Sequence, residues 1–311
     1  MKYADLHSDY LYKWKYKGID AVYQSDLNQL LAGNCLLQTF AILFNRSEIV
    51  DISAYYNKML EIFSNFITQN QAKIGLISSY SDILQNQKNG KISALLSFED
   101  SQILCESNNF IKKAYDDGVR LAGILWDGEN DIGFSYKEDK HLKALGIEVI
   151  KAMEDVGIIL DVSHLSDLGL DDVLKIARKP FLASHSNARS LTNHHRNLTD
   201  EQIKAISNKG GIIGINFYNR YIDLRRIDDL SESKIEYIVA HIKHMIKCGG
   251  ENCVAFGQDF DGVPEKSIAK AEIKDATYMP YLFEKLLNYF EYSVLEKIFY
   301  RNILDFMKDN L

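Results

Sequence analysis

The chain has 311 residues, of which 46% are hydrophobic and 25% charged, and its 36 basic and 43 acidic side chains give a formal net charge of −7. This composition is typical of globular proteins and excludes a disordered, collagen-like or coiled-coil chain. The acidic balance, without a basic stripe in the sequence, argues against nucleic acid as a partner.

The sequence offers no segment that would enter a membrane. Its longest apolar run, residues 35–44, is interrupted by Gln38 and Thr39 and is far shorter than the roughly 20 residues that span a bilayer. The N-terminus lacks the apolar core and cleavage site of a secretory signal. We therefore expect a cytoplasmic protein whose scattered cysteines are reduced, structural thiols.

Short apolar runs alternate along the chain with longer segments of helical period. The expected strands cover residues 3–6, 36–44, 92–98, 120–125, 158–162, 181–183, 211–216 and 254–257. The expected helices cover residues 49–68, 107–116, 140–155, 171–177, 200–208, 234–247 and 276–288. Repeated βα units of this number predict an α/β fold of the (β/α)8 TIM barrel type rather than an open sheet. No Pro-rich linker interrupts them, so we expect residues 1–311 to form a single domain.

Side chains of the types that bind metals follow five of these strands. They are His7 and Asp9 after the first strand, Glu99 after the third, His164 after the fifth, His185 after the sixth and Asp259 after the eighth. Taken singly, each could cap a turn or a helix. Taken together they predict a metal site, because the C-terminal ends of barrel strands meet at the face that carries catalytic residues. Imidazole nitrogens with carboxylate oxygens suit zinc or similar divalent ions, and Glu99 could bridge two of them.

These segments resemble the membrane (renal) dipeptidase family of metallopeptidases, within the amidohydrolase-like metal-dependent barrels. The resemblance rests on the motifs DLHSD at residues 5–9, SHSNAR at 184–189, HHRNLTD at 194–200, GQDFDG at 257–262 and RNIL at 301–304. It covers nearly the whole chain. It implies a metal-dependent dipeptidase that hydrolyses small dipeptides with a hydroxide bridging two divalent metal ions, zinc first and manganese as the alternative. It also implies a homodimer.

The resemblance implies a role for each matching residue. His7 and Asp9 resemble ligands of one ion, and His164 and His185 resemble ligands of the second ion. Glu99 resembles the catalytic carboxylate that bridges both ions. Asp259 resembles the catalytic acid that gives a proton to the leaving amine. Arg196 resembles the arginine that binds the free carboxylate of the substrate, a task that suits a planar guanidinium.

The sequence departs from the mammalian-type pattern in places. Trp126 stands where that pattern has a histidine after the fourth strand, and its indole can donate one hydrogen bond but cannot act as a base. Asp100 replaces the glycine that usually follows the bridging glutamate, and His195 replaces a proline. We expect Trp126 to contact substrate. Tyr218, after the seventh strand, would either line the pocket or serve in packing.

Two features carry less weight. His241 and His244 could pair on a metal, but a solvated outer helix face is the preferred interpretation, and the charged segment 223–236 is expected to be a solvated loop or rim. Two other functions stay open. One is another amidohydrolase-type reaction on the same site, such as hydrolysis of a cyclic amide, an N-acyl amino acid or a lactone, and the other is a catalytically silent metal-binding homologue.

Overall fold

The structure is a computed structural model that describes residues 1–18, 21–223 and 234–311. Its strands are β1 (Tyr3–Asp5), β2 (Cys35–Leu43), β3 (Ile74–Leu76), β4 (Ile92–Glu99), β5 (Val119–Gly123), β6 (Ile159–Asp161), β7 (Ile213–Ile215) and β8 (Val254–Phe256). Most of the charged segment 223–236 lies outside the described residues, so its expected solvated conformation stays a prediction.

Helices surround the strands. They are α1 (Tyr10–Lys17), α2 (Leu27–Ala32), α3 (Ile52–Gln69), α4 (Tyr80–Lys88), α5 (Asn108–Asp116), α6 (Ala144–Val156), α7 (Asp167–Ile176), α8 (Asp200–Asn208), α9 (Asn219–Ile222), α10 (Ile235–Gly249), α11 (Glu265–Ile268), α12 (Met279–Leu286), α13 (Tyr292–Glu296) and α14 (Asn302–Asn310). Short 3-10 helices cover Gln102–Cys105, Glu251–Cys253 and Ala276–Tyr278, and a π-helical turn covers Lys297–Arg301. Within the described ranges, no helix has both the length and the apolar character needed to cross a bilayer.

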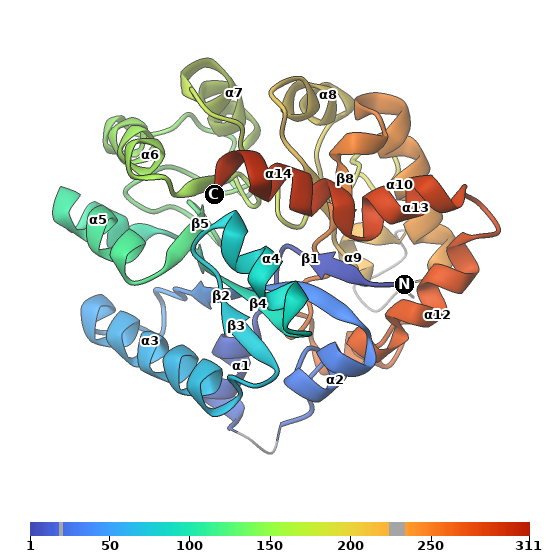
Figure 1. Ribbon diagram of the computed structural model, residues 1–311. Helices are drawn as coiled ribbons and strands as arrows, with labels where there is room; N and C mark the ends of the chain where they lie inside the picture. The colour runs from blue at the N-terminus through green and yellow to red at the C-terminus, as the bar shows by residue number, and fades with distance from the viewer. Residues whose placement is uncertain (19–20, 224–233) are drawn as a thin grey trace.

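The strands form a curled parallel sheet, which confirms the expected barrel class. β1, β2, β4, β5 and β6 pair in that order, and β7 pairs with β8. The two sheets meet on one side through single bridges at residues 182 and 183. On the other side, the Leu6 N–H donates to the carbonyl of Phe256 at 3.0 Å, which brings β1 beside β8. In Figure 1, α3, α5, α6, α7, α8 and α10 lie around the strands.

The prediction of a strand at residues 181–183 is wrong, because these residues do not form a continuous strand. Its residues form only isolated bridges, Leu182 with Asp161 and Ala183 with Ile213. The segment still bonds to both neighbours, because the Leu182 N–H donates to Leu160 and the Ala183 N–H donates to Ile212. The short strand β3, which the sequence did not predict, pairs with the start of β4.

Capping residues account for where α3 and α8 begin. Thr199 and Gln202 form a reciprocal capping box at the start of α8, whose bounds match the expected helix 200–208. Asp51 accepts from the Ala54 N–H at the start of α3. The other predicted helices are present, with ends displaced by up to four residues.

The barrel interior is filled with apolar side chains and closed at one end by α14. Leu6, Leu37, Leu95 and other inward-facing residues form one cluster with Ile303, Phe306 and Met307 of α14. Figure 1 shows α14 lying across this end of the strands. Because α14 covers the N-terminal ends, the C-terminal ends are left for a site.

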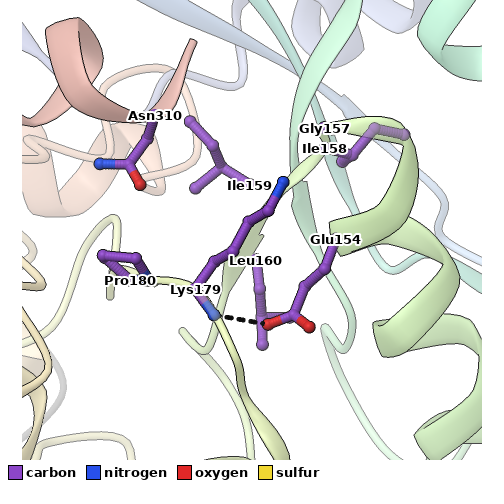
Figure 2. A pocket seen from close by; sticks show the side chains of 8 residues that line it. All are labelled: Glu154, Gly157, Ile158, Ile159, Leu160, Lys179, Pro180 and Asn310. Atoms are coloured by element: carbon purple, nitrogen blue, oxygen red, sulfur yellow. Dashed lines mark hydrogen bonds between the residues drawn. The ribbon is translucent and has the colours of Figure 1, made fainter.

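A small hollow lies where α14 meets the beginning of β6, and Figure 2 shows the residues around it. The Lys179 backbone N–H donates to Glu154 at 3.1 Å on its edge. The hollow has a volume of about 20 Å³, which is enough for about one water molecule. The hollow therefore offers no room for a substrate.

Candidate metal centre

The metal-binding side chains expected from the sequence meet at the C-terminal ends of the strands. The Glu99 carboxylate lies between two groups: Oε1 is 2.9 Å from Nε2 of His164, and Oε2 is 3.4 Å from Nε2 of His7. His7 Nε2 is 3.6 Å from Oδ2 of Asp9, and His185 Nε2 is 3.7 Å from Oε1 of Glu99. All five side chains are buried. They come from the segment after β1, the end of β4, and the segments after β6 and residue 183.

Asp259 lies on the same cluster. Its Oδ1 is 3.9 Å from Nε2 of His7, and one ligand atom each from His7, His185 and Asp259 lie within 4.8 Å of one another. The groups His7–Asp9–Glu99 and Glu99–His164–His185 meet the same criterion. Glu99 is the residue shared by these two groups.

The backbone is left-handed where several of these side chains leave the strands. His164 has φ 72°, Asp259 has φ 62°, and Asp100, which follows Glu99, has φ 64°. Residues with a side chain seldom adopt this conformation, and such strain is concentrated at functional sites. Asp100 binds Arg46 at 3.0 Å and Asn130 at 2.9 Å, so it holds the neighbouring loop.

Burial and the crowding of negative charge raise the pKa values of acidic groups in the metal-free chain. Burial, followed by the charge of Asp9, raises the pKa of Glu99 to about 8. Burial likewise raises the pKa of Asp259 to about 6. Burial lowers the pKa of His7, but the charges of Glu99 and Asp9 outweigh it and raise that pKa well above 6.5. The cluster therefore retains protons that a cation would replace.

The remaining two imidazoles, of His164 and His185, are held in the neutral form. Burial, together with the positive charges of Arg196 and His7, lowers the pKa of both His164 and His185 well below 6.5. Their Nε2 atoms lie 3.0 Å apart. Within the described residues, His7 Nε2, Asp9 Oδ1 and Glu99 Oε2 are buried without a hydrogen-bond partner. Unpaired nitrogen and oxygen atoms facing one another fit a divalent cation such as zinc.

A hydrogen-bond relay that the sequence did not reveal orients His185. The Ser184 hydroxyl donates to Asp161 at 2.5 Å and lies 2.6 Å from Nδ1 of His185. Because the hydroxyl hydrogen is directed to Asp161, the hydroxyl oxygen can accept from His185 Nδ1–H, which leaves the Nε2 lone pair for a metal. On the other side of the site, Asp5 accepts from the His7 N–H at 3.0 Å.

Asn216 is a second residue that sequence reasoning missed. Its side-chain amide donates to Oδ2 of Asp259 at 2.9 Å, and its Oδ1 accepts from the Tyr218 N–H at 2.7 Å. Asn216 lies one residue beyond β7. A search for polar side chains that directly follow strands would have found it if amide side chains had been included. This bond fixes the orientation of the Asp259 carboxylate.

A cavity of about 480 Å³ opens above the cluster. This volume is within the range of roughly 300–1,000 Å³ for small-molecule sites. Trp126 and Tyr218 both line the cavity, as expected if they contact substrate. The full lining is Asp9, Tyr12, Leu43, Glu99, Trp126, Asp127, Tyr136, Lys137, His164, Tyr218, Arg220, Tyr221, Asp259, Asp261 and Gly262.

Arg196 is buried beside the cluster with part of its guanidinium unused. Nη1 donates to the Ser186 hydroxyl at 2.9 Å. Among the described residues, Nε and Nη2 have no hydrogen-bond partner although both are buried. Buried guanidinium donors are costly when unpaired, so they suit an anionic partner. Arg196 itself is not among the residues that line the cavity.

The expectation of a solvated helix face is wrong for His241, whereas His244 is partly exposed. His241 is fully buried, and its Nδ1 accepts from the Ala188 N–H at 3.1 Å. His244 lies 2.8 Å from Asp200. The reason is that α10 packs against α8, so this face of the helix points inward.

Comparison with known proteins gives the family. A model of the membrane dipeptidase family (peptidase family M19) matches residues 1–310. The uncharacterised protein of the pqqA 5' region of Klebsiella pneumoniae is 31% identical over 263 residues, which cover 81% of this chain and 94% of that protein. An uncharacterised dipeptidase of Schizosaccharomyces pombe is 31% identical over 212 residues, which cover 65% of this chain and 48% of that protein.

Solved structures agree in fold. A metallo peptidase from Rhodobacter sphaeroides, solved with a phosphinate mimic of the dipeptide L-Ala-D-Ala, has a TM-score of 0.89 and 22% identity and covers 100% of this chain and 99% of its own. A dipeptidase of family M19 has a TM-score of 0.89 and 21% identity with the same coverage. Because the family model spans nearly the whole chain, the protein belongs to the membrane dipeptidase family of metallopeptidases, peptidase family M19.

Proposed function

We propose that the protein is a dipeptidase that hydrolyses small dipeptides with a hydroxide bridging two divalent metal ions, zinc first and manganese as the alternative. The observation that carries this proposal is the buried histidine–carboxylate cluster with the unpaired guanidinium donors of Arg196 beside it. The cluster suits cations, and the guanidinium suits a carboxylate. A dipeptide brings its carboxylate within two residues of the bond to be cleaved.

The two groups of side chains suggest how the ions are shared. We assign His7 and Asp9 to one ion and His164 and His185 to the other, with Glu99 binding both. The support is that the two oxygens of Glu99 face opposite histidines, at 3.4 Å and 2.9 Å. When bound, the ions would supply a hydroxide nucleophile at neutral pH and positive charge for the oxyanion that forms.

The protein's own side chains would bind the substrate and move its protons. Arg196 would hold the substrate carboxylate through its unpaired N–H groups. Asp259 would protonate the leaving amine, and its raised pKa of about 6 in the metal-free chain favours that task. Asn216 would keep this carboxyl pointed at the reacting bond, while Trp126 and Tyr218 would contact the substrate from the cavity wall.

Other amidohydrolase-type reactions and a silent metal-binding homologue are the competing functions. Arg196 favours the dipeptidase, because a cyclic amide or a lactone need not present a free carboxylate. The intact set of His7, Asp9, Glu99, His164, His185 and Asp259 argues against a silent homologue.

One panel experiment separates these functions. The metal-stripped protein is reconstituted with zinc or manganese and assayed against L,L- and L,D-dipeptides, N-acyl amino acids, cyclic amides and lactones. We expect turnover of dipeptides. Turnover confined to another class would replace the proposal with that reaction, and metal binding without any turnover would favour the silent homologue.

Three broader expectations remain proposals. We propose that residues 1–311 act as one barrel domain, that the protein forms a homodimer and that it resides in the cytoplasm. Size-exclusion chromatography with light scattering measures the oligomeric state, and limited proteolysis tests the single domain.

A further inference from the structure

Four polar side chains outside the central site meet between α8 and α10. Nε2 of His244 is 2.8 Å from Oδ1 of Asp200, 2.8 Å from Oγ of Ser190 and 3.4 Å from Sγ of Cys248. Asp200 also forms hydrogen bonds with Ser190 and Cys248. We call these residues the α8–α10 cluster.

The contacts exceed what one imidazole nitrogen can satisfy. Nε2 carries either one hydrogen or one lone pair and so makes one well-directed hydrogen bond. Here it faces a carboxylate oxygen, a hydroxyl and a thiol at the same time. One ligand atom each from Asp200, His244 and Cys248 lie within 4.8 Å of one another. A cation among them could replace these hydrogen bonds, since imidazole nitrogen, thiolate sulfur and carboxylate oxygen are all zinc ligands.

We propose that His244, Cys248 and Asp200 bind a divalent ion of the zinc class, with the Ser190 hydroxyl or water in the fourth position. Tetrahedral zinc with ordinary bond lengths separates its ligand atoms by about 3.3–3.6 Å. The His244–Cys248 separation of 3.4 Å already matches, and the oxygens of Asp200 and Ser190, each 2.8 Å from Nε2 of His244, need to move away from it by about half an ångström. His244 and Cys248 are one helical turn apart on α10, so both reach the same point.

The surroundings fit a peripheral ion rather than a catalytic one. The Asp200 side chain is 43% exposed and that of His244 is 17% exposed, so an ion can enter from solvent. Asp200 is the first residue of α8, and Ser190 lies in the segment that leads to it and carries Arg196. The ion would therefore tie this segment and α8 to α10, which is a structural function. The inference does not depend on the proposed dipeptidase activity.

Cobalt reports on this cluster selectively, because the central site contains no sulfur ligand. The full-length protein is stripped of metal, kept reduced and titrated with Co²⁺ alone. We expect a near-ultraviolet thiolate-to-cobalt absorption band in the wild type and in Glu99→Gln. We expect Cys248→Ser to lose the band and one bound equivalent of cobalt.

Two further variants serve as controls. Cys105→Ser removes another partly exposed thiol outside the cluster and should keep the band. In His244→Gln, the cobalt affinity measured from the absorption band should be weaker by at least about tenfold. A wild-type protein without the band, or a band that survives unchanged in Cys248→Ser, would overturn the proposal.

Thermal unfolding provides an independent readout. In the Glu99→Gln background, zinc should raise the midpoint of unfolding by several degrees, because binding to the folded state stabilises it. The shift should be smaller in Glu99→Gln/Cys248→Ser, because any zinc held by the remaining central side chains is common to both proteins. Equal zinc shifts in the two proteins would contradict a zinc site at Cys248.

Discussion

Gly262 lies directly against the carboxylate of Asp9. A Cβ added at Gly262 would overlap Oδ2 of Asp9 and would stand 2.6 Å from Oδ1 of Asp259. Real Cβ atoms do not approach so closely, and neither carboxylate can withdraw without leaving the cluster. Glycine at this position therefore makes room for two acidic groups of the site.

We predict that Gly262→Ala lowers metal affinity by about 10- to 100-fold, the range observed when groups that orient metal ligands are lost. The reason is displacement of Asp9. Zinc affinity, measured by competition with a chromophoric chelator, checks this.

The matched control is Gly133→Ala. The nearest atom to a Cβ at Gly133 is the Cδ2 methyl of Leu142 at 3.2 Å, the end of a flexible side chain. Its zinc affinity should equal that of the wild type. If Gly262→Ala binds zinc as tightly as this control, the close approach to Asp9 has no importance for the site.

Ser184→Ala tests the relay that orients His185. Loss of the hydroxyl removes the partner of His185 Nδ1 and one of the bonds to Asp161. We expect metal affinity to fall about tenfold and the free energy of unfolding to fall by about 1 kcal/mol. Isothermal titration with zinc and urea unfolding measure the two quantities.

Ser101→Ala separates metal binding from stability. Ser101 is also buried, and its hydroxyl donates to the backbone carbonyl of Gly123 at 2.9 Å rather than to a side chain of the cluster. It should lose similar stability and keep full metal affinity. Equal losses of affinity in both variants would mean that Ser184 acts only through the fold.

The sequence predicted the barrel and the residues at its mouth because both follow from local pattern. Alternating apolar and helical segments indicate βα units, and polar residues after strands converge once those strands are parallel. His7, Glu99 and Asp259 were predicted to converge in this way, and the structure brings them together.

The supporting groups could not be predicted by the same reasoning. The bond between Ser184 and Asp161 depends on the register of two neighbouring segments, and the contact of Gly262 with Asp9 joins opposite ends of the chain. The inward face of α10 was misjudged because Lys243 and Lys247 dominate its local composition, whereas packing against α8 decides which face is buried.

Asn216 variants should shift the pH at which Asp259 titrates in the activity profile. The amide of Asn216 stabilises the ionised carboxylate, so its removal raises the pKa of Asp259. We expect the limb of the pH–activity profile that reports the titration of Asp259 to move to higher pH. The move should be up to about one pH unit in Asn216→Ala and larger in Asn216→Asp. The aspartate variant retains an oxygen for the Tyr218 N–H and adds a negative charge. If this limb stays at the same pH in both variants, Asp259 is not the group whose titration the activity profile reports.

Arg196→Ala should impair substrates that carry a free carboxylate. Loss of charge-assisted hydrogen bonds lowers kcat/KM for a dipeptide by about 10- to 100-fold, chiefly through KM. The matched dipeptide amide should be nearly unaffected. Arg196→Lys should recover only part of the loss, since an ammonium cannot bind a carboxylate in the bidentate manner of a guanidinium. Equal losses for acid and amide would refute the assigned role.

Removal of the metal should make stability depend on pH above neutrality. In the folded metal-free chain, the pKa of Glu99 is raised from 4.5 to about 8 and that of His7 is raised well above 6.5. Above pH 6.5, the folded state therefore binds more protons than the unfolded state, so the free energy of unfolding falls as the pH rises toward 8. Below pH 6.5, His164 and His185 act in the opposite sense, because their lowered pKa values favour the folded state as they lose protons.

Urea unfolding in the presence of a chelator, at several pH values between 6.5 and 8, measures this decline. Glu99→Gln should flatten it, because an amide at this position has no proton to lose and leaves less negative charge beside His7. Zinc-loaded protein should show no decline, since metal binding has already displaced the protons from the ligands. If the metal-free wild type keeps a constant or rising free energy of unfolding over this window, Glu99 does not hold a proton in the folded chain, and the electrostatic account of the cluster is wrong.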